Sequence, residues 1–117
     1  MKKFIFDEYQ GCINPNRLEV GNSEFYIEIT TAFHDGKWYA SYWYWTKGKQ
    51  AVDEAPHLNT NAFETEEKAI CHSAECAIKL LEYENKSRHG IDVPDFIFKE
   101  LKDIKEKNNT PQLTLNF

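Results

Sequence analysis

Residues 112–117 carry side chains suited to binding a protein partner. Leu113, Leu115 and Phe117 are apolar, and Leu115 and Phe117 could each contribute about 1.5–3 kcal/mol on filling an apolar pocket, enough for micromolar binding. Gln112 has an amide that both donates and accepts hydrogen bonds. The polar residues 108–111 would extend about 13 Å and hold this peptide away from the preceding segment. The pattern therefore predicts a binding peptide on a polar spacer.

The same residues fit a structural interpretation. Apolar and polar side chains alternate along residues 112–117, which is the period of an edge strand with one face in water. Such a strand could pair with a sheet and close the fold. The two interpretations are compatible if the strand is loosely held. We therefore expect a single domain over residues 1–107, followed by a spacer and a binding peptide or terminal strand over residues 108–117.

Four aromatic side chains form a second candidate binding surface. They are Tyr26, Tyr39, Trp43 and Trp45. Such rings can stack on single-stranded nucleic acid, or form a protein interface, where Trp and Tyr are enriched. Stacking surfaces normally have basic neighbours, and only three lysines are close in sequence. The alternative is that residues 92–105, or the N-terminal segment, cover these rings.

The cysteines and histidines do not assemble into a recognisable chemical site. His72 and Cys76 are four residues apart and would share one side of a helix, but two ligands do not make a metal site. A thiol such as Cys12 needs a nearby base, and nothing in the sequence brings His34 or His57 to it. The sequence predicts no metal, no cofactor and no enzymatic activity.

Composition limits the class of protein. The 117 residues are 41% hydrophobic and 28% charged, which is typical of one globular domain. The net charge of −5 argues against general binding of a phosphate backbone. The chain has three cysteines, no signal peptide and no membrane-spanning stretch, so we expect a cytoplasmic protein with reduced thiols and no membrane association.

A β-hairpin must position the aromatic surface. Apolar and polar residues alternate over residues 25–34, the dipeptide Asp35-Gly36 suits a two-residue turn, and residues 38–45 are rich in strand-forming aromatics. A two-residue turn fixes the register. It places Ile27 opposite Tyr44 on a core face, and Tyr26 opposite Trp45 on a second face.

Two helices are predicted after the hairpin. Thr65 can cap a helix reaching about residue 86, whose apolar residues recur every three or four positions. A shorter C-terminal helix follows Asp92, with Pro94 in its first turn. Strands followed by helices indicate an α+β fold: an antiparallel sheet built on an Asp-Gly hairpin, packed by one long and one shorter helix.

Two resemblances supplement this interpretation. Gln112, Leu113, Leu115 and Phe117 resemble the peptides by which bacterial proteins bind the DNA polymerase sliding clamp. Residues 25–84 are similar in topology to HicB-type antitoxin domains, where a sheet with an Asp-Gly hairpin precedes a helix, although the proline- and glycine-containing segment before that helix is missing.

The first resemblance implies a non-enzymatic accessory protein of DNA replication or repair, or of a mobile element, that binds the clamp. Two alternatives remain open. One is a small acidic regulator or inhibitor, antitoxin-like or anti-defence, that binds a partner protein through the aromatic face. The other is a single-stranded nucleic-acid-binding module, although the acidic charge makes a protein partner the preferred expectation.

Overall fold

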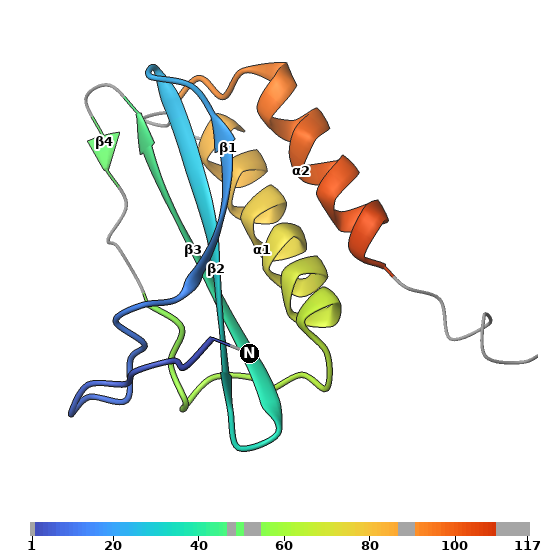
Figure 1. Ribbon diagram of the computed structural model, residues 1–117. Coiled ribbons are helices and arrows are strands. Elements are labelled where there is room, and N and C mark those ends of the chain that lie inside the picture. Colours follow the sequence, from blue (N-terminus) through green and yellow to red (C-terminus); the bar gives the residue numbers. More distant parts are fainter. Residues whose placement is uncertain (1, 47–48, 51–54, 87–90, 110–117) are drawn as a thin grey trace, which may run out of the picture.

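The computed structural model describes residues 2–46, 49–50, 55–86 and 91–109. The predicted α+β fold is confirmed, with an antiparallel sheet in the order β1-β2-β3-β4 and two helices after it (Figure 1). The described residues form β1 (Asn16–Gly21), β2 (Phe25–His34), β3 (Lys37–Thr46), β4 (Lys49–Gln50), α1 (Glu66–Lys86) and α2 (Asp95–Asn108). Within the described residues, no helix is long and apolar enough to cross a membrane.

The hairpin of β2 and β3 has the predicted register. Ile27 lies opposite Tyr44, and Tyr26 lies opposite Trp45. Asp35 and Gly36 have φ angles of 50° and 81°, the positive values that a two-residue hairpin turn of this type requires. The alternation in the sequence therefore assigned each hairpin side chain to its correct face.

Strand β1 was not predicted. It pairs with β2 through a tight connection in which the Asn22 backbone N–H donates to the Phe25 carbonyl at 2.8 Å. Gly21 precedes this connection with a φ of 106°, which residues with a side chain rarely adopt. A Cβ at Gly21 would lie 2.1 Å from the Phe25 carbonyl oxygen, so only glycine fits.

Helix α1 packs on the core face of the sheet, as its apolar stripe predicted. The Thr65 hydroxyl accepts the Lys68 backbone N–H at 3.1 Å, which confirms Thr65 as the capping residue. Leu81 and Ala77 are fully buried against Ile27 and Ile29 of β2. The helix ends at Lys86, as the sequence predicted.

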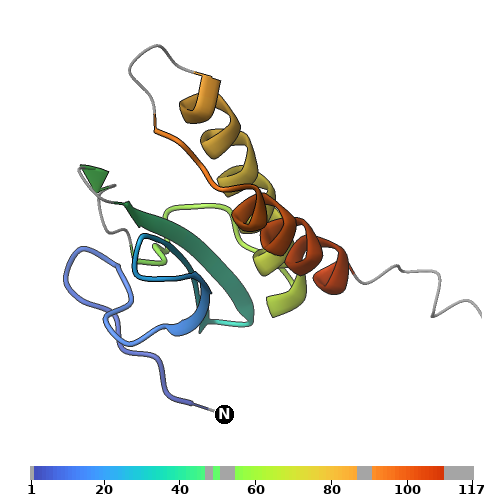
Figure 2. The same cartoon turned by 90° about the horizontal axis from the view of Figure 1, so that it is seen from above.

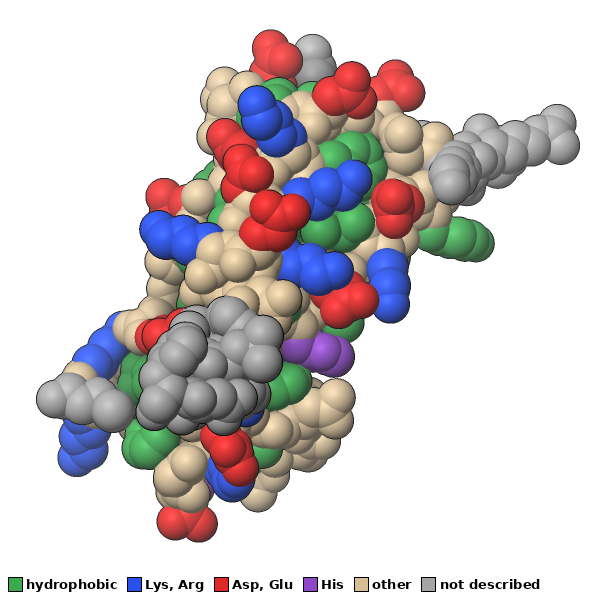
Figure 3. All heavy atoms as spheres, turned by 90° about the vertical axis from the view of Figure 1, so that its right-hand side faces the viewer, with side chains coloured by type: hydrophobic (Ala, Val, Ile, Leu, Met, Phe, Trp, Pro, Cys, Tyr) green, Lys and Arg blue, Asp and Glu red, His purple; other side chains and the backbone are tan. Residues whose placement is uncertain are grey.

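Helix α2 follows Asp92, as expected, but it begins at Asp95, so Pro94 is its N-cap residue and not part of its first turn. The helix does not cover the second face of the sheet. Its buried residues, Ile97 and Leu101, join the same core as Ile27. Figure 2 shows both helices on one side of the sheet. The expectation that residues 92–105 cover the aromatic face is wrong, because their apolar stripe is used against α1 and β1. The outer side of the helices carries charges of both signs (Figure 3).

The N-terminal segment covers one half of the second face. The Cys12 backbone N–H donates to the Pro56 carbonyl at 2.9 Å, which ties this segment to the chain before α1. The Phe6 ring lies 5.2 Å from the ring of His34, at the turn end of β2. Beneath this layer, Thr30 and Ala32 are almost inaccessible to solvent. This half of the sheet therefore lies between the helices and the N-terminal segment, which is on the opposite side of the sheet in Figure 2.

Candidate functional site

The predicted binding peptide lies outside the described residues. Gln112, Leu113, Leu115 and Phe117 all fall in this part of the chain, which begins after Asn109. Helix α2 ends at Asn108, the first residue of the predicted spacer. The choice between a binding peptide and a terminal strand therefore stays a prediction.

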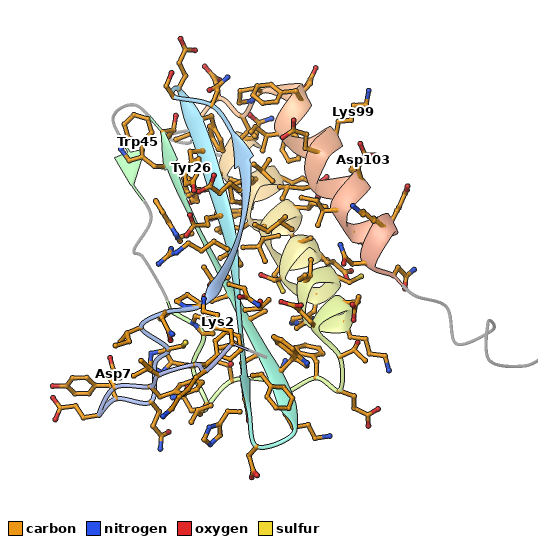
Figure 4. The ribbon with its side chains drawn as sticks, in the orientation of Figure 1. Lys2, Asp7, Tyr26, Trp45, Lys99 and Asp103 are labelled. Carbon is orange, nitrogen blue, oxygen red and sulfur yellow. The ribbon has the colours of Figure 1, made fainter. Side chains whose placement is uncertain are left out.

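Three of the four predicted aromatic residues come together at one end of the second face. The Tyr26 and Trp43 rings lie 5.4 Å apart, and Trp45 lies opposite Tyr26 in the sheet register. Figure 4 shows Tyr26 and Trp45 together near β4, away from Lys2. Tyr39 is four residues before Trp43 on β3, about 13 Å along the strand, and lies opposite the covered Ala32. The aromatic surface is therefore made by Tyr26, Trp43 and Trp45.

A buried carboxylate, Glu28, lies at the centre of this surface. The Tyr26 hydroxyl donates to its Oε2, and the Trp43 Nε1–H donates to its Oε1 at 3.0 Å. The Arg17 guanidinium of β1 also donates to Oε1 and forms an ion pair with it. The Glu28 side chain is 4% exposed and that of Arg17 is 49% exposed. Three strands thus contribute donors to one carboxylate.

The pKa values of this cluster follow from its contacts. Burial alone would raise the pKa of Glu28, but hydrogen bonds from Tyr26, Trp43 and Arg17, with the charge of Arg17, hold that pKa below its ordinary value. Burial, followed by hydrogen bonding to Glu28 and Glu19, raises the pKa of the Tyr26 phenol well above its ordinary value. Glu28 is therefore ionised and Tyr26 protonated at neutral pH.

Glu28 and Arg17 were missed as site residues. The predicted register places Glu28 opposite Trp43, which is one of its donors, but the other two donors come from β1 and from Tyr26, two residues away on its own strand. A signal was present in the sequence, since a glutamate at an alternating position in a strongly apolar strand needs donors if it is buried. Arg17 could not be assigned to this site because it lies on β1, a strand that the sequence did not predict.

The aromatic surface is open to solvent at its edge. Trp45 is 37% exposed, and Tyr26 and Trp43 are half-buried. Arg17, a basic side chain on this face, is already paired with Glu28, and the exposed Glu19 adds negative charge beside it. The described part of this face is thus aromatic on β2 and β3, and it carries one positive and one negative side chain on β1, Arg17 and Glu19.

The cysteines and histidines that the structure describes contact different parts of the fold. Cys76 Sγ lies 3.5 Å from His72 Nε2, as the helical spacing predicted. Within the described residues, no group of three or more potential metal ligands occurs. The Cys12 thiol donates to Asn14 Oδ1 at 3.5 Å, while the His57 ring lies beside Gly11.

Comparison with known proteins provides no relative. No family model, no curated protein and no solved structure matches this chain. The resemblances to sliding-clamp-binding peptides and to HicB-type domains therefore remain predictions.

Proposed function

We propose that this protein is a non-enzymatic accessory protein of DNA replication or repair, or of a mobile element, that binds the DNA polymerase sliding clamp through residues 112–117. The observation that carries this proposal is the motif itself, in which an amide at Gln112 precedes apolar side chains at Leu113, Leu115 and Phe117. The fold supports it, because α2 ends at Asn108 and Pro111 opposes continuation of a helix into the peptide.

The test is a titration of purified sliding clamp with the full chain and with a chain that ends at Thr110. We expect micromolar binding by the full chain, and loss of binding on truncation. The double variant Leu115→Ala/Phe117→Ala should abolish binding, whereas its matched control Thr114→Ala/Asn116→Ala should retain it. Equal affinity of the full and truncated chains, or absence of binding in both, would contradict the proposal.

The aromatic surface supports a second candidate function, that of a small acidic regulator or inhibitor of a partner protein, including antitoxin-like and anti-defence roles. The specific observation is the exposure of Trp45 beside Tyr26 and Trp43, since exposed Trp and Tyr in a cluster are enriched at protein interfaces. A pull-down with the wild-type chain and with Trp45→Ala identifies such a partner. A partner retained equally by both chains would contradict a role for this surface.

The third candidate, single-stranded nucleic-acid binding through the same rings, has less support. A stacking surface normally combines rings with an excess of positive charge, whereas the charge of Arg17 is balanced by Glu28. Tryptophan fluorescence during oligonucleotide titration at low and high salt tests it. Quenching at low salt that is lost at high salt would support nucleic-acid binding, and its absence at low salt would exclude it.

A further inference from the structure

Strand β1 is an edge of the sheet, with backbone groups that point away from the fold. Along β1, residues alternate between those whose backbone groups bond to β2 and those whose backbone groups point outward. The 2.8 Å hydrogen bond from the Asn22 N–H to the Phe25 carbonyl determines which residues are of each kind. By that alternation, the backbone of Leu18 faces β2, whereas the N–H and carbonyl groups of Arg17 and Glu19 face outward. Within the described part of the chain, no strand lies beyond β1. An exposed edge of this kind is a template for another strand.

We propose that a second copy of this chain docks on β1, so that two β1 strands pair antiparallel about a two-fold axis at Leu18 and form one continuous sheet. This register uses the outward groups of Arg17 and Glu19, which would exchange backbone hydrogen bonds with Glu19 and Arg17 of the second copy. Leu18 would face Leu18 of the second copy as a pair that is not hydrogen bonded. Such a contact is isologous, with the same surface used twice.

The charges of β1 favour this occupant. Arg17 and Glu19 flank Leu18 symmetrically and share one face of the sheet, so the two-fold axis places each Arg17 directly opposite a Glu19. Opposite charges that face each other across strands stabilise pairing, and like charges oppose it. Arg17 contacts Glu28 through Nη1 and its side chain is 49% exposed, so its other guanidinium nitrogens can pair with Glu19 of the second copy. The β1 edge of one copy is thus complementary in charge to the β1 edge of a second copy.

The other face of β1 adds an apolar contact. A hollow of about 330 Å³ lies between β1 and the start of α1, and its apolar lining is Leu18, Ile29 and Ile70. Antiparallel pairing would bring the second Leu18 to its rim, where the first Leu18 is only partly buried. Residues 112–117 are the other segment that could fill this edge, but they carry no charged side chain to match Arg17 or Glu19.

The test is the oligomeric state of the full chain by sedimentation velocity over a range of concentrations. One short strand makes a small interface, so we expect a reversible dimer that dissociates on dilution. Glu19→Lys would place a lysine opposite Arg17 of the other copy on both sides of the two-fold axis. This repulsion should raise the dissociation constant of the dimer about tenfold. A wild-type chain that stays monomeric at millimolar concentration, or a Glu19→Lys variant that dimerises as well as wild type, would overturn the proposal.

A second variant separates the edge from the fold. Glu19→Pro removes an outward N–H but none of the hydrogen bonds to β2, so it should weaken the dimer while the circular dichroism spectrum is unchanged. A chain that ends at Asn109 should dimerise like the full chain. Loss of dimer in that truncation would assign the contact to the tail and contradict the proposed edge.

Disulfide formation tests the register. Facing residues that are not hydrogen bonded have Cα atoms about 4.5 Å apart, which a disulfide can bridge. Leu18→Cys should therefore form a covalent dimer on mild oxidation. Asn16→Cys is the matched control, because its two copies would lie about 13 Å apart and should cross-link no more than wild type. The reverse outcome would overturn the two-fold axis at Leu18.

Discussion

Replacing Glu28 tests whether its carboxylate organises the aromatic surface. Leucine at this position would keep the side-chain volume but remove every acceptor. The Trp43 Nε1–H, which donates to Glu28 at 3.0 Å, would then be left without its partner, and the Tyr26 hydroxyl would keep only its contact with Glu19. Arg17 is half exposed and would turn to water. Glu28→Leu should therefore destabilise the fold through unsatisfied donors rather than through a cavity.

The size of the effect follows from these contacts. An unsatisfied buried donor costs about 1–3 kcal/mol, and Tyr26 is only half-buried, so we expect Glu28→Leu to lower the free energy of unfolding by about 3 kcal/mol. Glu28→Gln keeps a carbonyl acceptor and loses only the charge assistance, so about 1.5 kcal/mol is expected. Glu19→Gln, at the exposed position opposite Glu28, keeps a carbonyl acceptor for Tyr26, so it is the matched control and should change stability by less than about 0.5 kcal/mol.

Urea unfolding, followed by both tryptophan fluorescence and circular dichroism, measures these differences. For a chain of this size, about 3 kcal/mol corresponds to a fall in Tm of roughly 12 °C. The predicted order of stability is wild type and Glu19→Gln first, then Glu28→Gln, then Glu28→Leu. If Glu28→Leu were as stable as Glu19→Gln, the carboxylate would not be a structural centre, and this reasoning would be refuted.

Three further predictions concern pH, glycine geometry and the core. Contacts hold the pKa of Glu28 below its ordinary value of 4.5, so the stability that its carboxylate contributes is present above about pH 4.5 and is lost as the pH falls toward the lower pKa of the folded state. The difference in the free energy of unfolding between wild type and Glu28→Gln should therefore shrink in acid. A difference that stays constant with pH would contradict this prediction. Gly21→Ala should destabilise by more than about 2 kcal/mol, because the added Cβ meets a carbonyl at 2.1 Å, whereas Gly36→Ala meets nothing within 4 Å and should cost about 1 kcal/mol; equal urea midpoints for the two variants would refute this. Leu81→Ala removes a fully buried side chain and should cost about 2–5 kcal/mol, against less than about 0.5 kcal/mol for the 71% exposed Tyr83→Ala; similar melting temperatures would show that α1 is not packed as described.

Local signals in the sequence predicted most of the fold. The alternation over residues 25–34 and the Asp35-Gly36 turn determine the register, because a two-residue loop leaves little freedom in pairing. Thr65 caps α1 through a hydrogen bond to Lys68, only three residues away. These features depend on neighbours in sequence, so a single sequence was sufficient to predict them.

Features that depend on distant residues were not predictable. Strand β1 has six residues, two of them charged, and it is recognisable only once β2 lies beside it. The apolar stripe of α2 shows that this helix must pack, but it does not say on which face of the sheet. In the structure, this stripe packs in the same core as Ile27, together with the buried side chains of α1.

The contacts of Glu28 also bear on what the aromatic surface can do. A ring that is free to rotate loses conformational entropy when a partner binds, at about 0.5–1.5 kcal/mol for each immobilised side chain. Tyr26 and Trp43 are already held by hydrogen bonds to Glu28, so a partner would meet them in a fixed arrangement. Trp45, which is 37% exposed, lies beside these fixed rings. If a partner binds this face, we therefore expect Glu28 to favour that binding by ordering its neighbours. Glu28→Gln should then weaken the affinity for that partner, as measured by titration, even though Glu28 itself is almost entirely buried.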